Sequence, residues 1–91
     1  MLDDLILKGT ILNKLNRKGK WGASHTSFDN LQKGIPKHLR GKCKDIAENL
    51  IVEGLILEKT TSYGRHVSLN SNKKSEIEFI INAYLEAIGK T

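Results

Sequence analysis

The chain has 91 residues, of which 38 % are hydrophobic and 27 % are charged. This length excludes a second domain with its own core, and this composition excludes a chain that is disordered throughout. Lysine and arginine outnumber aspartate and glutamate by 15 to 10, and the resulting net charge of +5 favours an anionic partner. We expect one domain over residues 1–91, with a core and hairpin in residues 1–70 and a C-terminal helix in residues 71–91.

The first predicted element is a helix over about residues 3–17. Asp3 and Asp4 suit its start, where the helix dipole favours carboxylates. Its apolar residues cover more than half of the helical circumference, which is more than a one-sided surface helix needs. We therefore expect other elements to cover this helix from two sides.

A second, short helix is predicted around Phe28 and Leu31, which are its apolar anchors. Thr26 with Asp29 three residues later forms a capping-box pattern at its start. We expect a brief extended segment before it and a tight turn after it.

A third helix is predicted over about residues 36–53, where apolar residues recur at three- and four-residue spacing. Pro36 suits its first position, because the missing N–H has no partner there in any helix. Gly54 marks its end.

The last third of the chain predicts a hairpin and a helix. Two strands, over about residues 55–60 and 65–69, flank a polar turn in which Gly64 supplies a positive backbone angle. Ser75 with Glu78 forms a second capping-box pattern, followed by an apolar stripe at helical spacing. The order of elements predicts an α+β fold of the winged helix-turn-helix type, with a three-helix core, a β-hairpin wing and an extra C-terminal helix.

Two stretches resemble known winged-helix proteins. Residues 50–59 with residues 63–69 are similar to the join between recognition helix and wing in small prokaryotic winged-helix DNA-binding proteins. Residues 21–26 with residues 33–38 resemble small archaeal-type members of that superfamily. The resemblance spans about residues 5–70, and it implies that the third helix enters the major groove while the wing follows the backbone or the minor groove.

Charge is segregated along the chain. Residues 8–44 hold ten basic side chains and a single acidic one, Asp29, whereas residues 45–58 hold four acidic side chains and no basic one. In a winged helix the start of the third helix and the hairpin tip face the duplex. The predicted DNA-binding residues are Lys37, His38, Arg40, Gly41, Lys42, Lys44, Lys59, Thr61, Tyr63 and Arg65.

These residue types suit different contacts. Lysines neutralise phosphates, while Arg40 can also make a two-pronged contact to guanine. Gly41 has no side chain, so either the helix merely tolerates it or the backbone approaches the duplex closely there. For Tyr63 and His66, packing against the hairpin is an alternative to contact with nucleic acid.

Three other residues receive structural interpretations. Trp21 is expected to be a buried anchor between the first helix and the hairpin, and His25 to form local hydrogen bonds. Cys43 lies on the buried stripe of the third helix and is expected to act as a small hydrophobic residue. We predict no catalytic residue, no metal site and no cofactor, because no nucleophile grouping, phosphate-binding glycine loop or paired ligand spacing is present.

The sequence thus predicts a non-enzymatic protein that binds double-stranded DNA, as a small transcriptional regulator or chromatin-associated protein. A binding module for RNA or the ribosome, or a protein-interaction adapter, are the alternatives. The wide apolar stripe of the last helix, together with Phe79, suggests a homodimer; the alternative is a monomer in which the first helix covers the stripe and Phe79 is a single exposed hydrophobic residue. Without a membrane span or a leader pattern, we expect a cytoplasmic, nucleoid-associated protein.

Overall fold

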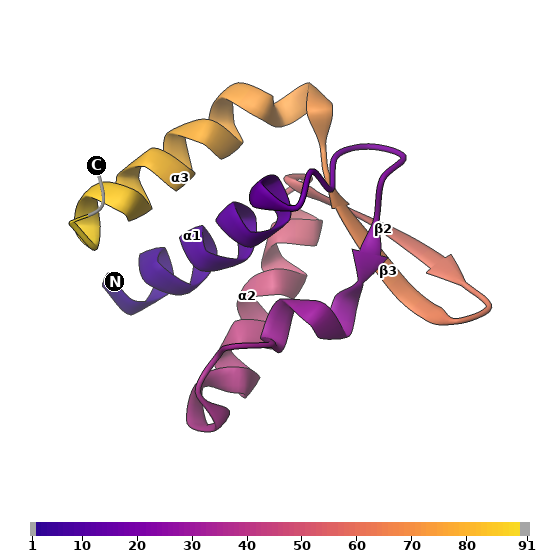
Figure 1. Cartoon of the computed structure of the whole chain (residues 1–91), viewed down its shortest axis with the longest axis horizontal. Coiled ribbons are helices and arrows are strands. Elements are labelled where there is room, and N and C mark those ends of the chain that lie inside the picture. The colour runs from indigo at the N-terminus through magenta and orange to yellow at the C-terminus, as the bar shows by residue number, and fades with distance from the viewer. Residues whose placement is uncertain (1, 90–91) are drawn as a thin grey trace.

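A computed structural model describes residues 2–89 as an α+β fold of three α-helices and one antiparallel sheet, which confirms the predicted class (Figure 1). The arrangement is compatible with a winged helix. The elements are α1 (Leu2–Arg17), β1 (Thr26–Ser27), the 3₁₀ helices η1 (Phe28–Gln32) and η2 (Lys37–Leu39), α2 (Arg40–Val52), β2 (Ile56–Thr61), β3 (Gly64–Leu69), the 3₁₀ helix η3 (Ser71–Lys73) and α3 (Lys74–Ala87).

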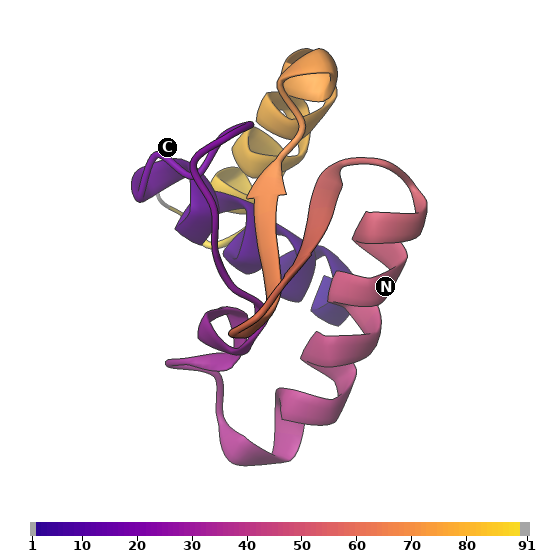
Figure 2. The same ribbon diagram turned by 90° about the vertical axis from the view of Figure 1, so that its right-hand side faces the viewer.

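The sheet has the strand order β1-β3-β2, so β3 lies in the middle (Figure 2). Thr61 pairs with Gly64 at the hairpin end, which leaves a two-residue tip. Gly64 adopts a φ of 113°, a backbone angle that side chains oppose, and this confirms its predicted role in the turn. Strand alternation then places Val67 and Leu69 in the core, and both are fully buried.

Helix α1 is covered from two sides, as its wide apolar surface predicts. It packs against α2 on one side and α3 on the other (Figure 1). Gly9 permits the close approach of α3, because a Cβ atom placed there would lie 2.1 Å from Cβ of Tyr84. The core therefore centres on α1, whose residues Ile11, Leu12 and Leu15 have no exposed surface.

The second helix is a 3₁₀ helix of five residues, and its predicted cap is wrong by one position. Ser27 is the N-cap, and its Oγ accepts a hydrogen bond from the backbone N–H of Asp29 at 3.3 Å. Thr26 belongs to β1 instead, where its hydroxyl accepts a bond from the Asn30 amide at 2.7 Å. The strand pairing of Thr26 with Val67 takes precedence over the local capping pattern.

Lys14 attaches η1 to α1. Its Nζ donates to the carbonyl oxygen of Asn30 at 3.0 Å and to that of Lys33. Partial burial lowers the pKa of Lys14 below its ordinary value of 10.5, and the nearby charge of Lys18 adds to this effect. A side chain of the first helix thus satisfies carbonyl groups in the turn that leads to α2.

The predicted third helix is divided into η2 and α2. Pro36 precedes η2 and is not its first residue, because its ψ of 141° is extended. The Pro36 carbonyl accepts a hydrogen bond from the N–H of Leu39 at 2.9 Å. At the far end, Gly54 has a φ of 82°, and the N–H of Leu55 bonds to the carbonyl of Leu50 at 3.0 Å. This is the glycine-terminated helix end that the sequence predicts.

Helix α3 begins before its predicted capping box. The side chain of Asn70 accepts a bond from the N–H of Asn72 at 3.0 Å and starts η3, which continues directly into α3 at Lys74. Ser75 and Glu78 are therefore inside the helix, and the prediction that they cap it is wrong. Residues 90–91 of the predicted helix and the Asp3 side chain lie outside the described residues. Among residues 2–89, no helix is long and apolar enough to cross a membrane.

Candidate nucleic-acid interface

Four predicted contact residues lie together at the start of α2. Lys37 and His38 are on η2, Arg40 and Lys44 are on the first turns of α2, and all four side chains are exposed. Gly41 is exposed between them. Arg40 and Lys44 are four positions apart on α2 and therefore neighbours on its surface, and Lys37 lies on η2, whose C-cap is Arg40. We call these three residues the cationic cluster.

The cationic cluster has no carboxylate partner within the described part of the chain. Arg40 donates from Nε to the carbonyl oxygen of Ile35 at 3.3 Å, which holds the base of its guanidinium against the turn. The two terminal nitrogens of Arg40 make no hydrogen bond in the described structure. They are the nitrogens that a two-pronged contact to a base or phosphate needs.

The Lys42 side chain lies against α1 and does not belong to the cationic cluster. Its Nζ lies 3.1 Å from a carboxylate oxygen of Asp4, on α1, and its side chain is partly buried. The helical rotation between Lys42 and its neighbours explains the difference, because successive residues point about 100° apart. The structure therefore separates Lys42 from the cationic cluster and pairs it within the fold.

The tip of the hairpin presents an aromatic side chain. Tyr63 is 91 % exposed, so the alternative that it packs against the hairpin is wrong. The hydroxyl of Thr61 donates to the Gly64 carbonyl at 3.0 Å and accepts from the Tyr63 N–H at 3.1 Å. Thr61 thus shapes the turn, while the Tyr63 ring is displayed.

The tip and α2 border a common polar hollow of about 320 Å³. Lys44 comes to it from α2, Tyr63 and Arg65 from the hairpin, and Phe28 and Asp29 from η1. Three elements that are separate in sequence therefore meet at this surface. Its charge is mixed, because Asp29 lies on the same hollow as Lys44.

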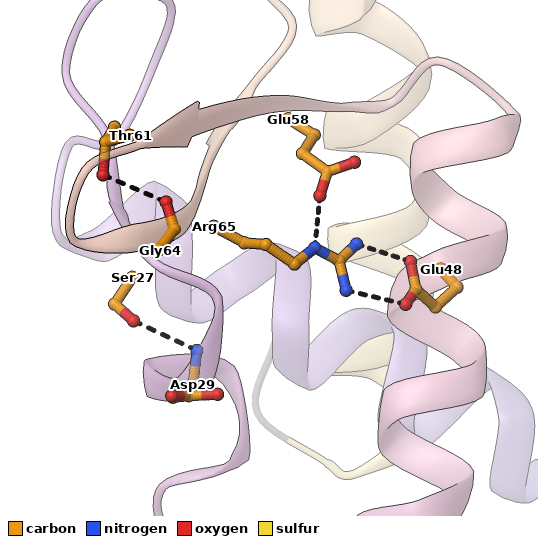
Figure 3. A network of polar contacts seen from close by, with 7 residues as sticks. All are labelled: Ser27, Asp29, Glu48, Glu58, Thr61, Gly64 and Arg65. Atoms are coloured by element: carbon orange, nitrogen blue, oxygen red, sulfur yellow. Dashed lines mark hydrogen bonds and ion pairs between the residues drawn. The ribbon is translucent and has the colours of Figure 1, made fainter.

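The Arg65 guanidinium forms hydrogen bonds to two carboxylates of the protein (Figure 3). Its Nη1 and Nη2 donate to the two carboxylate oxygens of Glu48 at 2.8 and 2.7 Å, and its Nε donates to Glu58. The guanidinium carbon also lies 4.1 Å from the ring centre of Phe28. These bonds lower the pKa of Glu48 below its ordinary value of 4.5. Arg65 therefore joins β3, β2, α2 and η1, and all three of its donor nitrogens are already bonded.

Lys59 lies on the other face of the hairpin. It pairs across the strands with His66, whereas Arg65 shares the inner face with Val67. The predicted wing residues thus divide into a tip with Tyr63, an inner face with Arg65 and an outer face with Lys59. Strand alternation would have revealed Glu58 as a same-face neighbour of Arg65 once the turn had set the register.

The structure confirms the expectation for Cys43, confirms it in part for Trp21 and contradicts it for His25. Trp21 lies between α1 and β3 as predicted, but it is only half-buried, and its Nε1 donates to the Asn16 side chain at 3.1 Å. Cys43 is fully buried, as predicted, and burial raises the pKa of its thiol. The partner of His25 is not local: its Nδ1 lies 2.8 Å from Nδ1 of His66 on β3.

No protein-family model, curated protein or solved structure matches this chain.

Proposed function

We propose that this protein is a winged-helix domain that binds double-stranded DNA. In this proposal α2 docks in the major groove, with Arg40 reading bases and Lys37 and Lys44 contacting phosphates. The hairpin follows the backbone or the minor groove with Tyr63 at its tip. A role as a small transcriptional regulator or chromatin-associated protein, bound to the nucleoid, follows from this activity.

The observation that carries the proposal is the cationic cluster. Three basic side chains are exposed at the start of one helix, none of them has an acidic partner in the described structure, and one of them, Lys44, borders the same hollow as Tyr63 at the hairpin tip. Two nearby acidic residues support the proposal as well, because Glu48 on α2 and Glu53 directly after it form ion pairs with Arg65 and Lys8, although Asp45 on α2 is exposed and forms no ion pair in the described structure. The charges of Glu48 and Glu53 therefore oppose a polyanion less than the sequence alone suggests.

Fluorescence anisotropy with a labelled duplex tests the proposal. A duplex of about 20 base pairs spans two helical turns and is long enough for one domain. Four to six phosphate contacts would give a slope of roughly −4 to −5 for log affinity against log salt concentration. An absence of binding at low salt would refute the proposal.

Competition between duplex DNA and structured RNA shows which nucleic acid the protein prefers. RNA helices hide base edges in a deep, narrow major groove, so a protein that inserts α2 into the groove should prefer DNA. Selection from a random duplex pool then measures sequence preference. Enrichment of one motif supports base reading by Arg40, whereas preferential displacement by RNA would assign the domain to RNA or the ribosome.

We further propose that the protein forms a homodimer through α3. Phe79 is 74 % exposed and faces away from Ile77 and Ile81, which are buried against the core. A symmetric dimer would place two α2 helices at half-sites about 34 to 36 Å apart.

Sedimentation equilibrium tests the dimer. Phe79→Glu should reduce the mass to that of a monomer. Val52→Glu is the matched control, because Val52 is 85 % exposed at the end of α2 and should leave the dimer intact. A monomeric mass for the unmodified protein across the micromolar range would refute this part of the proposal.

A further inference from the structure

Two histidines that are 41 positions apart in sequence meet on the outer face of the hairpin. Nδ1 of His25 lies 2.8 Å from Nδ1 of His66, and the rings meet edge to face at 79°. At this distance one Nδ1 must donate a proton and the other must accept it. The contact therefore consumes one nitrogen of each ring and leaves both Nε2 atoms for other partners.

Positive charge surrounds the pair. Lys59 stands directly across the strands from His66, and Lys20 lies in the loop before β1. Partial burial, followed by the charges of His66, Lys59 and Lys20, lowers the pKa of His25 below its ordinary value of 6.5. Such a setting disfavours a bound cation and favours a bound anion.

A hollow of about 440 Å³ adjoins the pair. Both imidazoles and Lys59 line it, together with Gly22 and Ser68. Glu58 also borders this hollow, but its carboxylate is bonded to Arg65. The ionisable groups that remain available are basic, and they come from the loop before β1, from β2 and from β3, whereas Ala23, Leu57 and Val67 supply apolar lining.

Protonation changes what the pair can donate. When both rings are neutral, the ring that accepts at Nδ1 carries its proton on Nε2, and the other ring has a lone pair there. One further proton from solvent gives both rings an Nε2–H group while the shared proton stays between the Nδ1 atoms. A second extra proton would place two N–H groups against each other and break the contact.

We infer that His25, His66 and Lys59 form a binding site for a small oxyanion, and that the imidazole pair takes up one proton when the anion binds. No covalent bond forms or breaks, because the anion is held by N–H groups and by charge. The ligand class is a tetrahedral oxyanion, either free or as a phosphate group of a nucleic acid. The site lies on the face of the hairpin opposite to Arg65.

Titration with sulfate tests the inference, because sulfate itself does not take up protons in this range. Calorimetry in two buffers of different ionisation enthalpy, at constant ionic strength, counts the protons bound with each sulfate. We expect an uptake that approaches one proton at about pH 7, and an affinity that rises as the pH falls from about 8 to about 6. Binding without proton uptake, or no binding, would overturn the inference.

Variants assign the effect to the site. Lys59→Gln should weaken sulfate binding about tenfold, and His66→Gln, which removes one of the two imidazoles, should reduce the proton uptake. Lys74→Gln is the matched control on α3, and it should change neither quantity. Lys59 is exposed, so its variant tests the site even if His66→Gln fails to fold. Unchanged sulfate affinity in Lys59→Gln would overturn the inference.

Binding of duplex DNA to the same variants shows whether the oxyanion is free or belongs to a nucleic acid. This experiment rests on the proposed function. If the site holds a backbone phosphate, Lys59→Gln should reduce the magnitude of the salt slope by about 1, and sulfate should compete with DNA. If the site holds a free oxyanion, Lys59→Gln should weaken sulfate binding about tenfold and keep full DNA affinity. Failure of DNA binding alone leaves the sulfate result standing.

Discussion

Arg65 and Glu48 hold the hairpin against helix α2 through two parallel hydrogen bonds of 2.8 and 2.7 Å. The two residues are 17 positions apart and belong to different elements. A two-pronged pair of this kind restricts direction as well as distance. It therefore sets the angle between the hairpin and the helix whose start carries the cationic cluster.

Folding stability should depend on the protonation of Glu48. Because its pKa is lowered in the folded state, the pair contributes fully above the ordinary value of 4.5, and this contribution is lost as the pH falls through the folded-state pKa. Urea unfolding at a series of acidic pH values measures this loss. In Glu48→Gln the dependence below pH 4.5 should flatten, whereas Glu78→Gln, on exposed α3 surface, should keep it.

Alanine substitutions of Arg40 and Lys44 should have different effects on DNA binding. Arg40→Ala should weaken binding to a selected duplex by about 1–3 kcal/mol and affect a scrambled duplex less, because a base contact is lost. Lys44→Ala should weaken both duplexes alike and reduce the salt slope by about 1. Anisotropy on both duplexes measures this, with Lys74→Ala as control. Equal losses for Arg40→Ala on the two duplexes would make Arg40 a phosphate contact.

Gly41→Ala should stabilise the fold and weaken DNA binding. A Cβ atom at Gly41 meets nothing within 4 Å, and alanine is favoured over glycine in a helix by about 0.5–1 kcal/mol. The melting temperature should therefore rise, while the added methyl group obstructs close approach of a duplex to the helix backbone. Unchanged affinity in a stabilised variant would show that the backbone does not come close to DNA at this position.

Gly9→Ala should destabilise the fold even though alanine is the better helix former. The added Cβ would lie 2.1 Å from Cβ and 2.2 Å from Cγ of Tyr84, so α1 and α3 must separate. Overpacking of this kind costs typically 1–3 kcal/mol, more than the helical gain of about 1 kcal/mol. Thermal unfolding of Gly9→Ala and of Gly41→Ala under the same conditions compares the two changes in stability. A similar stabilisation of both variants would contradict the close packing.

Elements that depend on local sequence were predictable. The apolar spacing and Gly54 place the end of α2, and Gly64 places the hairpin turn, because each depends on residues a few positions away. Capping was less predictable, since strand pairing of Thr26 and the Asn70 turn compete with the local patterns. The start of a helix depends on which of several polar side chains the rest of the fold leaves available.

The polar networks could not be predicted from spacing. Arg65 meets Glu48, and His25 meets His66, only after the hairpin has packed against its neighbours. The basic composition nevertheless identified the exposed start of α2, because a run of basic residues beside a buried stripe needs no long-range information. Lys42 shows the limit of that reasoning, since its partner Asp4 lies on a different helix, α1, far from Lys42 in the sequence.

The neighbouring residues Arg65 and His66 also fix how the two strands of the hairpin align. Arg65 faces the carboxylates of Glu48 and Glu58, whereas His66 faces His25 and Lys59. A shift of one residue along β3 would exchange their faces. Arg65 would then meet two basic groups, and Glu48 and Glu58 would lose their guanidinium. Misaligned pairing is thus opposed by charge on both faces at once, in addition to the exposure of apolar side chains.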